Sequence, residues 1–180
     1  MTKEDIQKLL EEHHVPFEEW GKGSAKTLDH LVKEVQQGES ELAVSSVTLI
    51  RRVRIAWIHV YCEVNGKTYR LKEEVQIFTG GRERRRILPG SIGEKLQTGE
   101  QADSNLVQRA LAEELGVQKT LSIRKLYAKD NREDSPSFPG LTMEAVNYFF
   151  EVKISPEEFK PEGYSEVQSD KVTFFVWEVI

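Results

Sequence analysis

Apolar residues recur at helical spacing in two stretches at the start of the chain. The first stripe consists of Ile6, Leu9 and Leu10. Thr2, followed three residues later by Asp5, forms a pattern that caps a helix. The second stripe consists of Leu28, Leu31, Val32 and Val35. The spacing predicts two helices, and together they make an N-terminal helical appendage over residues 1–40.

The pattern changes from about residue 41 to alternation of polar and apolar positions with many β-branched side chains. Residues 42–64 and 67–78 both have this character, and Asn65-Gly66 between them is a strong signal for a β-hairpin. Later segments of strand character lie at 121–129, 145–154 and 171–180. Two polar, turn-rich stretches are predicted to be loops, at 80–104 and 130–140.

One further helix is predicted in the middle of the chain, from Asp103 or Ser104 to Leu115, with Gly116 closing it. Strands before and after this helix predict an α/β domain whose mixed sheet is covered by helices. We place this domain at residues 41–180, after the appendage.

Length and charge narrow the classes of function. The 180 residues suffice for about one domain. The net charge of −5 disfavours bulk nucleic-acid binding, so any cationic site must be local. The single cysteine, Cys62, excludes an intrachain disulfide, and no apolar run reaches the roughly 20 residues of a membrane span. We therefore expect a cytoplasmic protein with no membrane partner.

The predicted central helix carries the candidate chemistry. At about 100° per residue, Ala110, Glu113 and Glu114 share one face. Two adjacent carboxylates beside a loop that carries Glu100 can hold Mg²⁺, which prefers oxygen ligands. The alternative is a solvated helix surface on which Arg109 and Glu113 form an ordinary ion pair four residues apart.

The stretch Gly93 to Val117, GEKLQTGEQADSNLVQRALAEELGV, resembles the Nudix box, G-x5-E-x7-R-E-U-x-E-E-x-G-U with U aliphatic. The residues that match its second half are Arg109, Leu111, Glu113, Glu114, Gly116 and Val117. Gly99-Glu100 resembles its Gly-Glu turn. The resemblance implies a Nudix-like α/β/α sandwich.

The resemblance also implies roles for the residues. Glu113, Glu114 and Glu100 would be ligands of Mg²⁺ or Mn²⁺, and Arg109 would orient the glutamates. Such a site would cleave a phosphoanhydride in a nucleoside diphosphate derivative. The box is degenerate, because Ala110 stands where the family has a glutamate and eight residues instead of seven separate Glu100 from Arg109. Glu94 is a possible substitute carboxylate, with an ion pair as its alternative role.

A group of arginines is the second set of candidate functional residues in the sequence. The candidate phosphate-binding residues are Arg82, Arg84, Arg85 and Arg86 in the long loop, with Arg51, Arg52 and Arg54 on an earlier strand. The alternative is a solvated loop whose arginines pair with nearby acids. Two further functions therefore stay open beside hydrolysis: a catalytically silent nucleotide-binding or regulatory module, and an RNA-associated protein that uses the arginine-rich loop. For a hydrolase or a silent nucleotide-binding module, the partner is a small nucleotide or phosphoanhydride. The sequence leaves the oligomeric state open.

Overall fold

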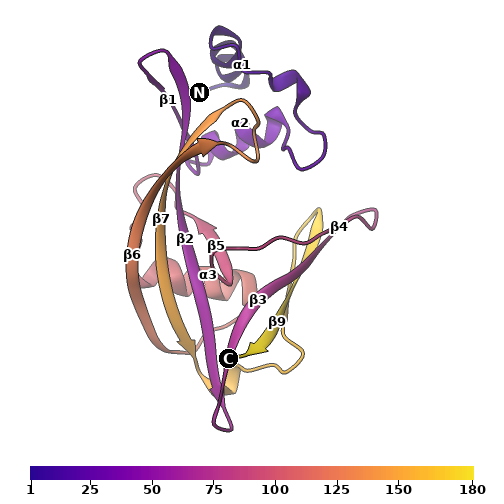
Figure 1. The fold of residues 1–180 in the computed structure, drawn as a ribbon, viewed down its shortest axis with the longest axis vertical. Helices are drawn as coiled ribbons and strands as arrows, with labels where there is room; N and C mark the ends of the chain where they lie inside the picture. The colour runs from indigo at the N-terminus through magenta and orange to yellow at the C-terminus, as the bar shows by residue number, and fades with distance from the viewer. The chain divides into compact units, whose positions relative to one another are not determined.

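The computed structural model covers residues 1–180, and the chain divides into two compact units. Unit 1 consists of Met1–Ile55, Lys95–Glu100 and Ala128–Asn147. Unit 2 consists of Ala56–Glu94, Gln101–Tyr127 and Tyr148–Ile180. Three long strands contribute residues to both units, namely β2 (Thr48–Val64), β6 (Thr120–Asp134) and β7 (Thr142–Ile154) (Figure 1). A domain boundary at residue 40 stays a prediction.

The N-terminal helices of unit 1 form where the sequence predicts them. Helix α1 spans Lys3–Glu12, and α2 spans Leu28–Gln36, with a short 3-10 turn, η1, at Phe17–Glu19 between them. The Thr2 hydroxyl accepts a hydrogen bond from the Asp5 amide, and the Asp5 carboxylate accepts one from the Thr2 amide. This reciprocal pair satisfies donors that the first helical turn otherwise leaves open.

The apolar faces of α1 and α2 are buried in one hydrophobic core. Ile6, Leu10 and Leu31 are fully buried there, together with Leu49 of β2 and Phe138 of the segment between β6 and β7. The N-terminal helices therefore share a core with strand residues of unit 1.

Two hairpins shape the first strands. β1 (Glu41–Ser45) pairs antiparallel with β2, and Ser46 takes a left-handed conformation in the turn between them. β2 pairs antiparallel with β3 (Lys67–Phe78) around Asn65 and Gly66. The φ angles of these two turn residues are 51° and 72°. Positive φ at both positions is what a two-residue hairpin turn of this sequence requires, so the hairpin prediction is confirmed.

The sheet has the order β6-β7-β2-β3-β9-β8, in which β8 spans Tyr164–Val167 and β9 spans Lys171–Val179. β3 and β9 are antiparallel, whereas β2 and β7 run in the same direction (Figure 1). The predicted α/β class with a mixed sheet is confirmed. A second 3-10 turn, η2, lies at Pro156–Glu158.

Helix α3 (Ser104–Leu115) is the predicted central helix and belongs to unit 2. The Asp103 carboxylate accepts hydrogen bonds from the amides of Asn105 and Leu106 at its start. Gly116 closes it at φ 69°, the left-handed conformation that glycine adopts without a steric penalty.

The secondary structure differs from the prediction in three places. The stretch predicted as one loop at 80–104 contains β4 (Glu83–Arg84) and β5 (Ile92–Lys95), which pair with β3 and β2. β6 continues to Asp134 through residues predicted to be a loop, and β8 was not predicted at all. These segments are short or carry many charged, exposed side chains, so backbone pairing with a neighbouring strand decides their conformation and propensity does not.

No helix in the chain combines the length and the apolar character needed to cross a membrane.

Candidate functional sites

Two places in the molecule gather groups that can bind or transform a ligand: the surroundings of α3 in unit 2, and a cavity in unit 1. The apolar side of α3 packs into the core through Leu106, Leu111 and Leu115. Ala110 is on this buried side with 0% exposure. The helix position at which the Nudix pattern has its first glutamate is therefore part of the hydrophobic core in this chain.

Arg109 joins two carboxylates in unit 2. Its Nη1 lies 2.8 Å from Oε1 of Glu94 and 3.1 Å from Oε2 of Glu113. The ion pair expected between Arg109 and Glu113 is thus present, and Glu94 takes the alternative role of an ion-pair partner. The side chain of Glu113 is 62% exposed, so it lies in solvent and not in a pocket.

Glu114 is in a different environment from its neighbour Glu113. Burial raises the pKa of Glu114 to about 8, and the negative charges of Glu166, Glu94 and Glu73 act in the same direction, partly offset by Arg86. At neutral pH the carboxyl is therefore mainly protonated. A carboxyl with such a raised pKa is a mark of functional sites, although structural clusters also produce it.

The carboxylates around α3 do not fit a resident divalent cation. Nowhere in the chain do three or more His, Cys, Asp or Glu side chains gather closely enough to hold a metal ion. Glu94 and Glu113 are both ion-paired with Arg109, and Glu73 is held by two hydrogen bonds from Arg86, each 2.7 Å long. Ala110 supplies no oxygen. A cation site built from Glu113, Glu114 and Glu100 stays a prediction.

Glu100 belongs to unit 1, whereas Arg109, Glu113 and Glu114 belong to unit 2. Within unit 1 the Glu100 carboxylate accepts a hydrogen bond of 3.0 Å from the backbone amide of Gln97. This contact closes the turn at Gly99, which has a φ of 82°. The turn geometry that the box resemblance implies is present, and a joint role for Glu100 and the helix glutamates is untested.

The arginine-rich segment is engaged mainly with strand β3. Arg85 contacts the Glu74 carboxylate at 2.6 Å, Arg86 donates from Nε and Nη2 to the two carboxylate oxygens of Glu73, and Arg82 stacks over the Phe78 ring at 4.4 Å. These contacts match the alternative in which the arginines pair with nearby acids. Arg84 differs, because no hydrogen bond or ion pair holds it. A phosphate-binding role for the four arginines stays a prediction.

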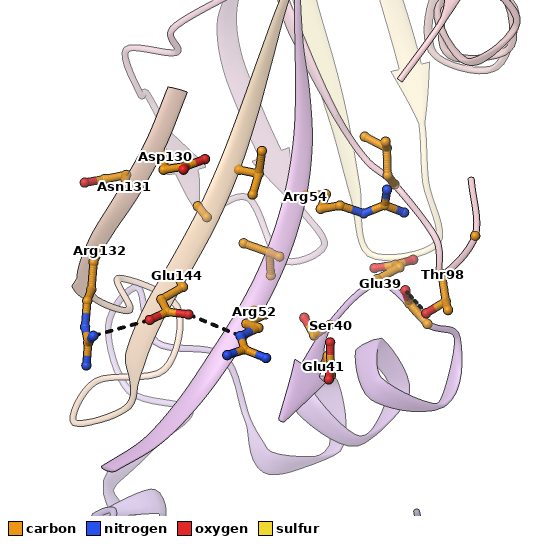
Figure 2. Close-up of a pocket in the computed structure, with 16 residues that line it drawn as sticks. Glu39, Ser40, Glu41, Arg52, Arg54, Thr98, Asp130, Asn131, Arg132 and Glu144 are labelled. Carbon is orange, nitrogen blue, oxygen red and sulfur yellow. Dashed lines mark hydrogen bonds and ion pairs between the residues drawn. The ribbon is translucent and has the colours of Figure 1, made fainter. Parts of the chain in front are cut away.

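A cavity of about 700 Å³ lies entirely within unit 1 (Figure 2). Its apolar lining includes Val53, Leu96 and Ala145, each at most 3% exposed. Its polar lining comes from five chain segments and includes Ser40, Arg52, Arg54, Asp130, Asn131, Arg132 and Glu144. The volume is in the range of small-molecule sites.

The arginines of this cavity fall into two kinds. Glu144 bridges Arg52 at 3.2 Å and Arg132 at 3.3 Å, so these two guanidinium groups share one carboxylate as counter-charge (Figure 2). Arg54 instead donates to the backbone oxygen of Gln97 at 2.7 Å and has no carboxylate partner. A guanidinium that faces a cavity without a counter-charge is a candidate anchor for an anionic ligand.

A buried ion cluster adjoins the cavity in unit 1. The Glu34 carboxylate, whose side chain is 6% exposed, contacts Arg51 at 2.6 Å, Lys26 at 2.7 Å and Lys95 at 2.5 Å. Ser40, which lines the cavity, donates its hydroxyl hydrogen to the same carboxylate at 2.9 Å. Burial alone would raise the pKa of Glu34, but Lys95, Arg51 and Lys26 hold it well below its usual range.

Sequence reasoning named Arg52 and Arg54 as strand arginines but did not place them at a cavity, and it did not identify Arg132 or Glu34. Residues 52 and 54 are two positions apart on one strand, and this spacing puts both side chains on one face. This spacing was the one sequence signal that could have grouped the two arginines. The partners from β6, β7 and the segment after β5 meet only through the tertiary fold.

The fold and these sites define an α/β protein with a carboxylate cluster around α3 and a separate cavity. No protein-family model matches the chain, and no curated protein matches it in sequence. Among solved structures, it is similar to the Nudix domain of Shewanella oneidensis NrtR, crystallised with ADP-ribose. The identity is 14% and the TM-score 0.43, covering 70% of this chain and 71% of that one.

It is also similar to the Ap4A hydrolase of C. elegans, at 12% identity and a TM-score of 0.36, covering 69% of this chain and 78% of that one. We draw no conclusion about ligand, metal or activity from likenesses at these TM-scores.

The raised pKa of Glu114 predicts a pH effect on stability. The folded state keeps the Glu114 proton up to about pH 8, whereas the unfolded chain releases it near its ordinary pKa of about 4.3. The folded state therefore binds more protons in this window, and stability falls as the pH rises from about 4.3 to 8. The variant Glu114→Gln should lose this dependence and exceed the wild type in melting temperature at pH 8.

Thermal unfolding followed by circular dichroism between pH 5 and 9 measures this effect. Glu113→Gln on the same helix is the matched control, because its carboxylate is exposed. Parallel pH profiles for wild type and Glu114→Gln would contradict the prediction.

Proposed function

We propose that this protein is a catalytically silent module that binds a nucleoside phosphate in the cavity of unit 1. The observation that carries the proposal is the pairing of an apolar floor with an uncompensated guanidinium at Arg54. An apolar surface suits a base or sugar, and a guanidinium binds phosphate oxygens through two parallel hydrogen bonds. Asn131 adds an amide that can both donate and accept a hydrogen bond.

The other charges of the cavity favour selectivity over general anion binding. Arg52 and Arg132 are held by Glu144, and Glu39, Glu41 and Asp130 add negative charge to the rim. A ligand with diffuse negative charge is repelled by these acids, whereas a phosphate placed at Arg54 meets a single cation. The cavity is thus suited to a ligand whose negative charge is confined to one end and whose larger part is neutral.

Isothermal titration calorimetry with ADP tests this function. Arg54→Ala should weaken ADP binding by about 10- to 150-fold, because a hydrogen bond to a charged group contributes about 1.5–3 kcal/mol. Arg54→Lys should recover only part of the affinity, since an ammonium cannot form the bidentate contact. Adenosine, which lacks the phosphates, should bind Arg54→Ala and the wild type equally.

Arg85→Ala is the matched control, because Arg85 is an exposed arginine of unit 2 outside the cavity. It should bind ADP like the wild type. A loss of ADP affinity in Arg85→Ala but not in Arg54→Ala would instead assign binding to the arginine-rich segment and overturn the proposal.

A metal-dependent phosphoanhydride hydrolase is the second candidate, and the raised pKa of Glu114 is the observation that favours it. The donor set around α3 supplies no fitting metal site, so we derive no catalytic step through a cation. Incubation of ADP and other nucleoside diphosphate derivatives with the protein and Mg²⁺ or Mn²⁺ separates the two functions. Phosphate or nucleoside monophosphate release that Glu114→Gln abolishes would establish the hydrolase.

A further inference from the structure

Three aromatic rings form a stacked row across neighbouring strands of unit 2. The ring of Tyr127 in β6 stacks on Phe149 in β7 with centroids 4.5 Å apart and an interplanar angle of 22°. Phe149 stacks in turn on His59 in β2 at 6.4 Å and 23°. We call these three side chains the aromatic row. Because β6 is the last strand in the sheet order, the outer ring face of Tyr127 has no further strand beside it.

Phe149, the middle ring of the aromatic row, lies on the sheet face opposite α3. Lys125 donates to the Ala102 oxygen just before α3, and its ammonium lies over the rings of Tyr148 and Phe150. Successive side chains of a strand alternate between faces, so Phe149 points away from that side. Helix α3 lies behind these strands (Figure 1), and unit 2 has no other α-helix to cover the face that carries Phe149. Tyr127, which stacks on Phe149 from the edge strand, is 55% exposed.

The last ring of the aromatic row lines a cavity that also contains basic side chains. His59 lines this cavity of about 420 Å³ together with Arg70, Lys72, Arg86 and Glu73, and Glu73 is paired with Arg86. Burial and the charge of Arg70 lower the pKa of His59, so at neutral pH it is an uncharged aromatic ring. Arg70 is paired with Glu178 at 2.8 Å, whereas the side chain of Lys72 has no hydrogen bond or ion pair.

The arginine-rich segment adds to the positive charge on this side of unit 2. Arg86 lines the cavity, and the pKa of the nearby Arg84 is lowered by burial and by repulsion from Arg86 and Arg82. Lys72 and Arg84 are therefore cations without a carboxylate contact, and Lys72 lines the same cavity as His59. This combination occurs although the chain as a whole carries a charge of −5.

We propose that the aromatic row and the adjoining cavity bind single-stranded nucleic acid, with bases stacked on Tyr127 and His59 and backbone phosphate at Lys72 and Arg70. Every base has a π face, and stacking on aromatic side chains with phosphate contacts from Lys and Arg is the general mode of sequence-tolerant single-strand binding. A duplex keeps its bases stacked on each other, so it cannot use the aromatic row. This surface belongs to unit 2 and is independent of the nucleoside phosphate cavity proposed in unit 1.

Fluorescence anisotropy with a labelled oligouridine of roughly 12 nucleotides, within the usual site sizes, tests this proposal on the full chain. Tyr127→Ala should weaken binding by about 5- to 150-fold, the loss typical of one stacked base. Tyr127→Phe keeps the ring and should bind like the wild type. Position 127 is exposed, so neither Tyr127→Ala nor Tyr127→Phe is expected to change the melting temperature appreciably.

The charge contribution is measured by salt dependence. Lys72→Gln should make the plot of log affinity against log salt shallower by about 0.7, the value for one phosphate contact to a single strand, whereas Tyr127→Ala should leave the slope unchanged. Lys22→Gln is the matched control, because Lys22 is an exposed, unpaired lysine of unit 1. Oligothymidine of the same length shows whether the bound strand is RNA or DNA, and binding of either one meets the proposal.

Three results would overturn this inference: oligonucleotide affinity that is equal in Tyr127→Ala and the wild type, equally tight binding of a duplex, or the same slope change in Lys22→Gln as in Lys72→Gln. Competition by uridine monophosphate at the same nucleotide concentration would also overturn it, because the site would then hold a mononucleotide. The ADP titration of Arg54→Ala is unaffected by any of these outcomes.

Discussion

Replacement of Glu34 by alanine is expected to destabilise unit 1 by about 3–5 kcal/mol, the usual cost of removing one partner from a buried ion pair. The Glu34 carboxylate is the common partner of Arg51, Lys26 and Lys95, and the Arg51 side chain is only 4% exposed. Without the carboxylate the buried Arg51 loses its counter-charge, and Lys26 and Lys95, which are more exposed, repel it. Glu34→Gln keeps the shape and the hydrogen-bond acceptor but not the charge, so it should recover only a small part of the loss.

Urea unfolding of the wild type and the two variants measures this effect, with Glu39→Ala as a matched control. Glu39 contacts only Lys95 among these cations, at 3.5 Å, and is more exposed. Its removal should cost less than about 1 kcal/mol, as for other partly exposed ion pairs. A Glu34→Ala variant as stable as Glu39→Ala would show that the cluster contributes no net stability.

The same carboxylate predicts an acid-sensitive unit 1. The folded pKa of Glu34 is held below its usual range, so its contribution is fully present above the unfolded pKa of about 4.3 and is lost as the pH falls below it. Glu34→Gln cannot be protonated, and the difference in stability between it and the wild type should therefore shrink steadily below about pH 4.

Introduction of a glutamate at position 110, which would restore the Nudix pattern, is expected to destabilise the protein by at least about 3 kcal/mol. Ala110 is fully buried on the core side of α3, next to Leu106 and Leu111. The new side chain must either lose its charge in an apolar environment or push the helix away from the core, and both are costly. We expect no gain in Mg²⁺ affinity from Ala110→Glu.

Thermal unfolding and Mg²⁺ titration of Ala110→Glu measure both consequences. Gln108→Glu adds the same charge at an exposed position of the same helix and should leave the melting temperature nearly unchanged. If Ala110→Glu folds with wild-type stability and binds Mg²⁺ more tightly, the carboxylate reaches a cation site, and the assignment of this helix face to the core is wrong.

Local signals in the sequence predicted much of the fold. The capping pair at Thr2 and Asp5, the hairpin turn at Asn65-Gly66 and the left-handed Gly116 each act over a few residues, so their structures follow from short stretches of sequence. The sequence also predicted the ion pair of Arg109 and Glu113, because a spacing of four residues on a helix determines it.

The carboxylate cluster and the cavities depend on residues that are distant in sequence. Glu73, Glu94 and Glu166 come to Glu114 from three separate strands, and their effect on its pKa arises only when the sheet and α3 are assembled. Likewise, the helical spacing did not predict that Ala110 lies in the core. The spacing shows which residues share a face of the helix, but it does not show which face packs against the sheet.

The position of β6 at the edge of the sheet affects the tendency of the protein to aggregate in solution. It is the last strand in the order of the sheet, so one side of its backbone has amide and carbonyl groups with no neighbouring strand. Its exposed residues include Lys125, Lys129, Asp130, Arg132, Glu133 and Asp134. A charged edge strand resists pairing with the edge of another molecule. The charged residues because of which the end of β6 was predicted to be a loop therefore protect the protein against edge-to-edge aggregation.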